Sequence, residues 1–331
     1  MKKLITLSLL FLIVESYSQE TDSTFANGQR KYSGNNVNGE YLSYFENGQL
    51  AKKENYVYGK KQGESIWWEP NGKLKCKCNF IDDKEHGELF AYYENGQVKY
   101  YGNYVSGVLQ GEWVEYYENG QIEVKGSYYN GLLQGEWSRY HKNEGLRSKT
   151  NYIDGEFQGE WSSYYENGQL KAKGNYLNGI EQGECISYFE NGQLYSKENY
   201  LNGVRHGEWI TYFENNQVQD SGCYLNGLKN GEWISYYENG TLRSKVYYKD
   251  GAEQGLYVGY HENGQLSSTG NYSSGRRHGE WIWYWDNGNL KSKENYKDAI
   301  LHGEYVEYSY DDGAIVKVIY HKNGTKKNKS K

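Results

Sequence analysis

The chain has 331 residues and a formal net charge of -6, with 37% hydrophobic and 17% aromatic residues. So few aliphatic side chains argue against ordinary thick-cored domains, whereas disordered chains lack such an aromatic content. The negative charge argues against nucleic-acid phosphates or an anionic membrane surface as the main binding target.

The amino terminus has the pattern of a secretory signal peptide. Lys2 and Lys3 precede an apolar run from Leu4 to Val14, and Ser16 and Ser18 provide small residues at the two positions that a signal peptidase reads. The run is too short to cross a bilayer and fits the apolar region of a signal peptide. We therefore expect residues 1–18 to be removed and the chain to be exported to the periplasm, the outer surface or the medium. An uncleaved anchor is the alternative.

Most of the remaining chain consists of tandem copies of one 24-residue repeat. The pair Asn-Gly occurs at residues 47, 71, 95 and 119 and recurs at this period up to residue 287, and Gly-Glu-Trp recurs with the same period. Fixed self-similarity of this kind indicates a repeat architecture. We expect about twelve tandem repeats over residues 19–320, the first one shortened. The basic tail 321–331 is interpreted as protection of an exposed apolar strand rather than as a nucleic-acid arm.

Each repeat has the pattern of a β-hairpin followed by a second short turn. Asn-Gly between two alternating runs is typical of a two-residue type I′ turn. Residues 159–166 should therefore pair antiparallel with residues 169–176 about Asn167-Gly168. Because both connections are short, successive strands must be neighbours. The predicted fold is all-β: an elongated, single-layer, twisted antiparallel meander of tandem 24-residue hairpins.

This pairing assigns two different faces to the sheet. On one face Trp161 should lie opposite Gly174, and Tyr165 should lie opposite Leu170. On the other face Tyr164 should lie opposite Lys171, as part of a tyrosine column that recurs in the repeats. Lysine and glutamate side chains flank that column, and their stems can lie on its rings.

The repeats resemble a known family. The stretch from Gly270-Asn271-Tyr272 to His278-Gly279 looks like a MORN repeat (membrane occupation and recognition nexus). Gly-Glu-Trp followed by Tyr-Tyr-Glu-Asn-Gly is most similar to the bacterial variant found in proteins labelled YwqK-family antitoxins. The resemblance implies an elongated antiparallel sheet with an aromatic groove for protein segments or, in some members, lipid. It also implies an antitoxin-like role.

The sequence contains no glycine-rich phosphate loop, serine nucleophile elbow or zinc motif. We therefore expect no enzyme activity, no cofactor and no metal. Four histidines occupy the same position in the loops of their repeats: His86, His206, His278 and His302. This placement favours a structural role in the turn over metal binding.

The four cysteines are poorly placed to pair. Cys76 and Cys78 lie two residues apart on one predicted strand, so their side chains would project in parallel from one face. Cys185 and Cys223 would lie three strands apart, at roughly 14 Å. Four unpaired thiols are therefore expected.

The leading hypothesis is an exported, non-catalytic repeat scaffold that binds a protein partner through an aromatic groove. The uninterrupted tryptophans at 113, 137 and 161 favour a local partner site. A rod that binds an extracellular polysaccharide and an antitoxin or immunity-like protein are the alternatives; neither nucleic acid nor membrane lipid is expected as a partner. The candidate groove residues are Tyr104, Trp113, Tyr128, Trp137, Tyr152, Trp161, Tyr200, Trp209, Tyr224 and Trp233.

Overall fold

The structure is a computed structural model that describes residues 23–327. The predicted signal peptide, residues 1–18, and the last four residues of the predicted tail lie outside the described residues. Within residues 23–327 no helix is long and apolar enough to cross a membrane, and every regular element is a β-strand. The described residues divide into two compact units, with the boundary between Leu132 and Leu133, and each unit is described separately.

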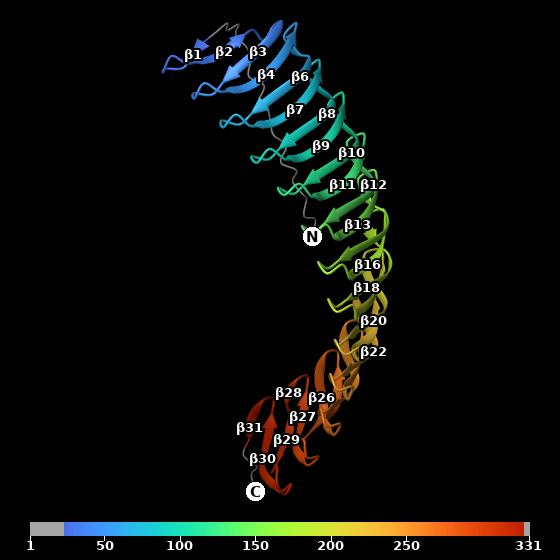
Figure 1. Cartoon of the computed structure of the whole chain (residues 1–331). Coiled ribbons are helices and arrows are strands. Elements are labelled where there is room, and N and C mark those ends of the chain that lie inside the picture. Colours follow the sequence, from blue (N-terminus) through green and yellow to red (C-terminus); the bar gives the residue numbers. More distant parts are fainter. Residues whose placement is uncertain (1–22, 328–331) are drawn as a thin grey trace. The chain divides into compact units, whose positions relative to one another are not determined.

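The first unit contains short strands at its amino-terminal end and longer hairpin strands after them (Figure 1). Its strands are β1 (Ser23–Thr24), β2 (Arg30–Gly34), β3 (Gly39–Tyr44), β4 (Leu50–Val57), β5 (Lys60–Lys61), β6 (Gly63–Trp68), β7 (Leu74–Ile81), β8 (Lys84–Tyr92), β9 (Val98–Val105), β10 (Val108–Tyr116) and β11 (Ile122–Tyr129).

The second unit continues the same pattern of strands and includes all but the first residue of β12. Its strands are β12 (Leu132–Tyr140), β13 (Leu146–Ile153), β14 (Glu156–Phe157), β15 (Gly159–Tyr164), β16 (Leu170–Leu177), β17 (Ile180–Glu181), β18 (Gly183–Tyr188), β19 (Leu194–Leu201), β20 (Val204–Tyr212), β21 (Val218–Leu225), β22 (Leu228–Tyr236), β23 (Leu242–Lys249), β24 (Ala252–Tyr260), β25 (Leu266–Ser273), β26 (Arg276–Tyr284), β27 (Leu290–Lys297), β28 (Ile300–Leu301), β29 (Gly303–Tyr308), β30 (Ile315–Lys322) and β31 (Thr325–Lys327).

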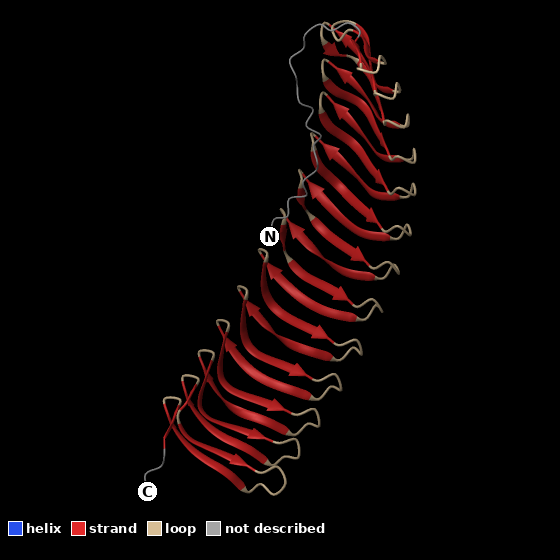
Figure 2. Ribbon diagram, turned by 90° about the vertical axis from the view of Figure 1, so that its left-hand side faces the viewer, coloured by secondary structure: helices blue, strands red, loops and turns tan. Residues whose placement is uncertain are grey.

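Within each unit the strands form an antiparallel meander, and Figure 2 shows the hairpins lying side by side. In the hairpin of β15 and β16, Glu160 pairs with Asn175 and Trp161 pairs with Gly174. This confirms the predicted all-β fold and most of the predicted register. The period of the sequence therefore corresponds to one hairpin and its connection to the next.

The turn at Asn167-Gly168 differs from the predicted type I′ turn. Tyr165 accepts a hydrogen bond from the Gly168 amide at 2.9 Å, and the Tyr165 amide donates to the Gln169 carbonyl at 2.9 Å. Gly168 has a φ of +82°, whereas Asn167 does not have a positive φ. This is a type I turn closed by a glycine bulge, which inserts one more residue into the loop than the predicted turn.

The bulge changes the pairing next to the turn. The register shifts between Ser163 and Tyr164, so that Tyr164 pairs with Leu170 rather than with Lys171. The predicted pairing of Tyr165 with Leu170 is wrong, because Tyr165 is the first residue of the turn. Its ring lies under the Lys171 ammonium at 5.4 Å, on the lysine-bearing face of the sheet. A shift of one residue in a strand moves side chains to the other face.

The type I′ geometry occurs instead in the connection between hairpins. Asn178 and Gly179 have φ values of +50° and +74°, and the flanking residues Leu177 and Ile180 form a pair. Positive φ at both central residues defines the type I′ turn. Asparagine and glycine suit these positions because they tolerate the left-handed conformation better than other residues do.

Hydrogen bonds from the turns link each repeat to the next. Asn167 Nδ2 donates to the Glu190 carbonyl at 2.9 Å, and the Tyr165 hydroxyl donates to the Tyr188 carbonyl at 2.8 Å. At the opposite edge, the side chain of Gln158 accepts from the Asn178 amide at 2.8 Å. These bonds give the repeated Asn-Gly and Gln-Gly residues a structural role in stacking the hairpins.

The carboxyl-terminal strand is longer than predicted. β30 runs to Lys322, and β31 pairs with it through a further turn at Asn323-Gly324, whose φ values are +51° and +75°. The first residues of the predicted tail, 321–327, therefore continue the sheet, because Asn-Gly supports one more hairpin turn. Ile315 and Val316 in β30 are 61% and 64% exposed, in agreement with an apolar strand at the edge.

Candidate functional site

The candidate groove residues lie on one face of the sheet in each unit. We call this the aromatic face; it carries Trp161, Gly174, Tyr176 and the residues at equivalent positions of the other repeats. The indoles of Trp113, Trp137 and Trp233 are 5–7% exposed, whereas Trp161 and Trp209 are half-buried. The five tyrosines of the candidate set are also half-buried.

In the first unit the groove residues pack on neighbouring strands. The Trp113 ring stacks on Tyr100 at 5.1 Å and meets the edge of Tyr128 at 5.9 Å. Tyr104 follows Gly102 by two residues and lies on the same face. Burial raises the pKa of Tyr104 to about 12. Much of the ring surface in this unit is therefore used within the sheet.

In the second unit the rings form a row of contacts along the face. Trp137 meets the edge of Tyr152 at 6.3 Å, and Phe157 lies 4.8 Å from Tyr152 and 5.0 Å from Tyr176. The Tyr176 ring is 6.3 Å from Trp161. Phe157 is 36% exposed and was not among the candidate residues. This stretch is apolar and open to solvent at its centre.

Further along the second unit, a second group of contacts surrounds Trp233. Its ring lies 5.2 Å from Trp209 and 5.2 Å from Tyr224, and its indole N–H donates to the Cys223 carbonyl at 3.2 Å. Tyr200 donates a hydrogen bond to Glu198 at 2.9 Å. The structure therefore brings Trp209, Tyr224 and Trp233 together, whereas Tyr200 is engaged with a carboxylate.

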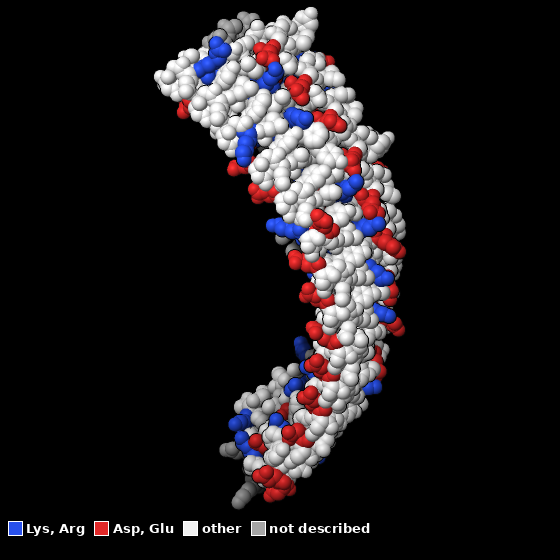
Figure 3. Space-filling model, viewed as in Figure 1, with Lys and Arg blue, Asp and Glu red and all other residues white. Residues whose placement is uncertain are grey.

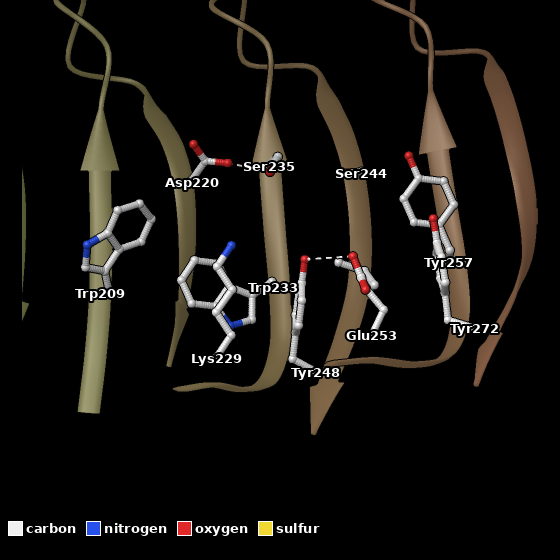
Figure 4. A pocket seen from close by; sticks show the side chains of 11 residues that line it. Trp209, Asp220, Lys229, Trp233, Ser235, Ser244, Tyr248, Glu253, Tyr257 and Tyr272 are labelled. Atoms are coloured by element: carbon white, nitrogen blue, oxygen red, sulfur yellow. Dashed lines mark hydrogen bonds between the residues drawn. The ribbon is translucent and has the colours of Figure 1, made fainter. Parts of the chain in front are cut away.

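Beside Trp233 the aromatic face is hollowed into an open cavity of about 260 Å³ (Figure 4). Five rings, three charged side chains, two serines and a valine line it. We call it the Trp233 pocket; its residues are Trp209, Asp220, Lys229, Trp233, Ser235, Ser244, Val246, Tyr248, Glu253, Tyr257 and Tyr272.

The charged groups of the Trp233 pocket lie on three successive hairpins. The Ser235 hydroxyl donates to the Asp220 carboxylate, and the Tyr248 hydroxyl donates to Glu253 at 3.4 Å. The Lys229 ammonium lies 3.9 Å from the centre of the Trp233 ring and 5.1 Å from that of Tyr248. The pocket thus combines ring faces with two acceptor groups and one cation.

Two tyrosines of the pocket, Tyr248 and Tyr257, are held in their neutral form. Burial, followed by the nearby Glu253 carboxylate, raises the pKa of Tyr248 to about 12. Burial also raises the pKa of Tyr257. At neutral pH both hydroxyls therefore remain hydrogen-bond donors, and the charge in the pocket comes from Asp220, Lys229 and Glu253.

Sequence reasoning missed the Trp233 pocket, although one signal was present. The position of Asp220 carries a small residue in neighbouring repeats, as at Ala172, Ser196, Ser244 and Ser268. A carboxylate in this row departs from the pattern. Lys229 and Glu253 stand at a position that is also charged in the adjacent repeats, at Arg205 and Arg277, so no comparable signal was present there.

The glycines of the aromatic face lie beneath tryptophan rings. A Cβ added to Gly102, Gly222 or Gly270 would overlap the indole of the following repeat, at Trp113, Trp233 or Trp281. The predicted pairing of Trp161 with Gly174 is confirmed, and there the Trp161 Nε1 would stand 2.9 Å from such a Cβ.

The other titratable side chains show no built site within the described residues. No group of three or more His, Cys, Asp or Glu side chains in residues 23–327 is arranged to hold a metal ion. All four cysteines are free. Burial raises the pKa of Cys76 and Cys185 to about 11 and that of Cys78 to about 12, which keeps these thiols protonated at neutral pH.

Charged side chains on the outer surface are mixed in sign. Figure 3 shows acidic and basic residues interspersed over the face in view. Glu112 pairs with Lys125 at 2.9 Å and Glu136 pairs with Lys149 at 2.6 Å, and these four side chains are 45–51% exposed. In these two repeats the glutamate of Gly-Glu-Trp thus forms an ion pair with a cross-strand lysine.

A family model described as MORN repeat variant matches most of the hairpin repeats. Its matches begin every 24 residues, at residues 37–58, 61–82, 85–106, 109–130, 133–154, 157–178, 181–202, 205–226, 229–250, 253–274 and 277–298. A search of curated proteins returned no match.

Two solved structures match most of this chain at low sequence identity. One, "Crystal Structure of TcdB2-TccC3-Cdc42", is 15% identical, with 91% of this chain and 18% of that chain covered and a TM-score of 0.18. Another, "Crystal Structure of TcdB2-TccC3-TEV", is 11% identical, with 89% of this chain and 19% of that chain covered and a TM-score of 0.17. The chain thus spans less than a fifth of the length of either.

Proposed function

Because the chain belongs to the MORN repeat variant family, we propose that it is an exported, non-catalytic scaffold that binds a segment of a partner protein on its aromatic face. The observation that carries the proposal is the Trp233 pocket, which five aromatic rings line. Tryptophan and tyrosine are the residues that most often dominate protein-binding surfaces. Export is supported by the basic and apolar pattern of residues 1–18.

The aromatic face offers two kinds of surface for an extended segment. The apolar row around Phe157 can take an aliphatic or aromatic side chain, and the Trp233 pocket can take a polar one. Both belong to the second unit, and both present rings that are partly open to solvent. A segment that places suitable side chains in both would be selected by spacing as well as by chemistry.

The proposal is tested with purified residues 19–331 and a displayed library of unstructured peptides. A selected peptide should bind at least tenfold more weakly to Phe157→Ala or Tyr257→Ala, because each change removes ring surface from the proposed site. Tyr236→Ala, in the tyrosine column of the opposite face, is the matched control. Near-ultraviolet circular dichroism verifies that each variant is folded. Equal losses on both faces would overturn the assignment to the aromatic face.

A second candidate is a polysaccharide-binding scaffold. It is favoured by the combination of ring faces with hydroxyl and carboxylate groups in the Trp233 pocket, because sugars offer both apolar faces and hydroxyl groups. A glycan array separates the two candidates: glycan binding that is lost in Tyr257→Ala, together with no selected peptide, would favour the polysaccharide. In the antitoxin-like role implied by the family resemblance, the protein partner would be a toxin.

A further inference from the structure

The charge inside the Trp233 pocket is unbalanced. Asp220 and Glu253 contribute two negative charges and Lys229 contributes one positive charge. Among the ion pairs formed by residues 23–327, none includes either carboxylate or this lysine. Their partners are neutral groups: Ser235 for Asp220, Tyr248 for Glu253 and the Trp233 ring for Lys229.

The two carboxylates keep unused acceptor capacity. An ionised carboxylate offers about four acceptor positions, and each of these two receives one hydroxyl donor from the pocket wall. Figure 4 shows Asp220 between Trp209 and Ser235, and Glu253 beside Tyr248, with the Tyr257 and Tyr272 rings beyond Glu253. A ligand in the pocket would therefore meet acceptors and ring faces together.

We propose that the Trp233 pocket receives a positively charged side chain of the bound segment, with a guanidinium group as its best match. The inference rests on the proposed function, since it names the side chain that the partner segment would place there. A guanidinium is planar, carries five N–H donors and stacks on aromatic rings, so it can use a carboxylate and a neighbouring ring together. Lys229 already lies over the Trp233 and Tyr248 rings, and Arg277 is hydrogen-bonded to Tyr272. This leaves the Glu253 carboxylate and the Tyr257 ring for the incoming cation.

The sign of the response to Lys229 separates this ligand from others. A cation in the pocket is repelled by Lys229 and attracted by Asp220 and Glu253. An anionic side chain or a phosphate would need Lys229 and would be repelled by the carboxylates. A neutral sugar would respond weakly to the charge of any of the three.

The test compares N-acetyl-arginine methylamide with its neutral counterpart N-acetyl-citrulline methylamide. Binding is followed by the nuclear magnetic resonance signals of the Trp209 and Trp233 indole N–H groups. We expect the arginine compound to bind at least about fivefold more tightly than citrulline, because citrulline keeps the shape and loses the charge. Equal binding of the two compounds, or binding of neither over the same concentration range, overturns the inference.

Two conservative variants complete the test. Glu253→Gln keeps an acceptor for Tyr248 and should weaken arginine binding at least about fivefold, whereas Lys229→Gln should strengthen it about twofold or more. Loss of binding in Lys229→Gln would identify an anionic ligand instead. Unchanged thermal unfolding of both variants shows that the pocket remains folded.

The outcome is separable from that of the proposed function. A library peptide that binds the aromatic face, is weakened by Phe157→Ala, and is unaffected by Glu253→Gln and by exchange of its arginines for citrulline would leave the scaffold proposal standing. The same result would overturn the inference about the cation. Failure of Phe157→Ala and Tyr257→Ala to weaken the peptide would overturn the proposed function.

Discussion

Several positions of the aromatic face require glycine because an indole ring lies directly over the backbone there. Gly222 pairs with Trp209 in its own hairpin, and a Cβ on it would overlap the Trp233 ring of the next repeat. Trp233 is 5% exposed in this position. A side chain at residue 222 would therefore have to displace a large buried ring or shift the strand beneath it.

Gly222→Ala should lower the free energy of unfolding by about 1–3 kcal/mol, which is the usual cost of overpacking. Urea-induced unfolding measures the loss. Ser221→Ala, whose side chain lies on the opposite face, is the control and should change stability by about 0.5 kcal/mol or less. A neutral Gly222→Ala would mean that Trp233 does not lie over residue 222.

Cysteine reactivity should differ strongly along the chain. Burial raises the pKa of Cys78 to about 12 and that of Cys185 to about 11, whereas Cys223 is exposed. Because the thiolate is the nucleophile, iodoacetamide near pH 8 should modify Cys223 well before Cys78 and Cys185. Mass spectrometry of timed samples measures the order, and unfolded protein, in which all four thiols react, is the control. Similar rates for Cys78 and Cys223 in the folded protein would contradict the burial of Cys78.

At the scale of the hairpin, two turns with similar sequences differ in backbone conformation and in the contacts they make. Asn167-Gly168 forms a bulged type I turn whose asparagine bonds to the next repeat, and Asn178-Gly179 forms the type I′ turn. The asparagine at residue 167 accepts the Gln169 amide at 2.9 Å and donates to the Glu190 carbonyl at 2.9 Å. One side chain therefore closes its own turn and ties it to the neighbour.

Asn167→Ala should lower the free energy of unfolding by about 1 kcal/mol, since it removes two exposed hydrogen bonds. Asn167→Asp retains the acceptor for Gln169 and loses the donor to Glu190, so it isolates the bond between repeats. Calorimetric or urea unfolding of both variants measures the difference. If the aspartate variant were as stable as the natural chain, the bond to Glu190 would contribute nothing.

The pairing of the two strands could be predicted from the sequence, but the face of the sheet on which the Tyr165 side chain lies could not. The alternation of side chains along a strand places Trp161 and Gly174 on the same face for either type of turn, because both residues lie several positions away from it. Next to the turn, the prediction depends on whether the loop has two residues or a bulge. Asn-Gly satisfies both, since glycine accepts the positive φ that each requires.

At the scale of the whole chain, tyrosine ionisation should limit stability in alkali. Burial raises the pKa of Tyr104, Tyr176 and Tyr248 from 10.0 to about 12, and Glu181 and Glu253 add to the effect at the last two. The folded state thus holds these protons more tightly than the unfolded state does. Their contribution to stability is fully present below pH 10 and is lost as the pH rises toward 12.

The free energy of unfolding should therefore fall steadily between pH 10 and pH 12. Urea unfolding at several pH values measures it, and absorbance near 295 nm follows tyrosine ionisation in the same samples. Phenolate absorbance that rises around pH 10 in the folded protein, for all tyrosines alike, would contradict the raised pKa values.

The sequence alone determined the repeat, its period, the antiparallel neighbours and the face shared by Trp161 and Gly174. These follow from local alternation and from turns too short to allow other partners. The tertiary structure decided the turn types, the side of Tyr165 and the Trp233 pocket. Asp220, Lys229 and Glu253 come from three hairpins, so they meet only when the stacking of repeats sets their distances, and the pattern within one repeat does not contain that information.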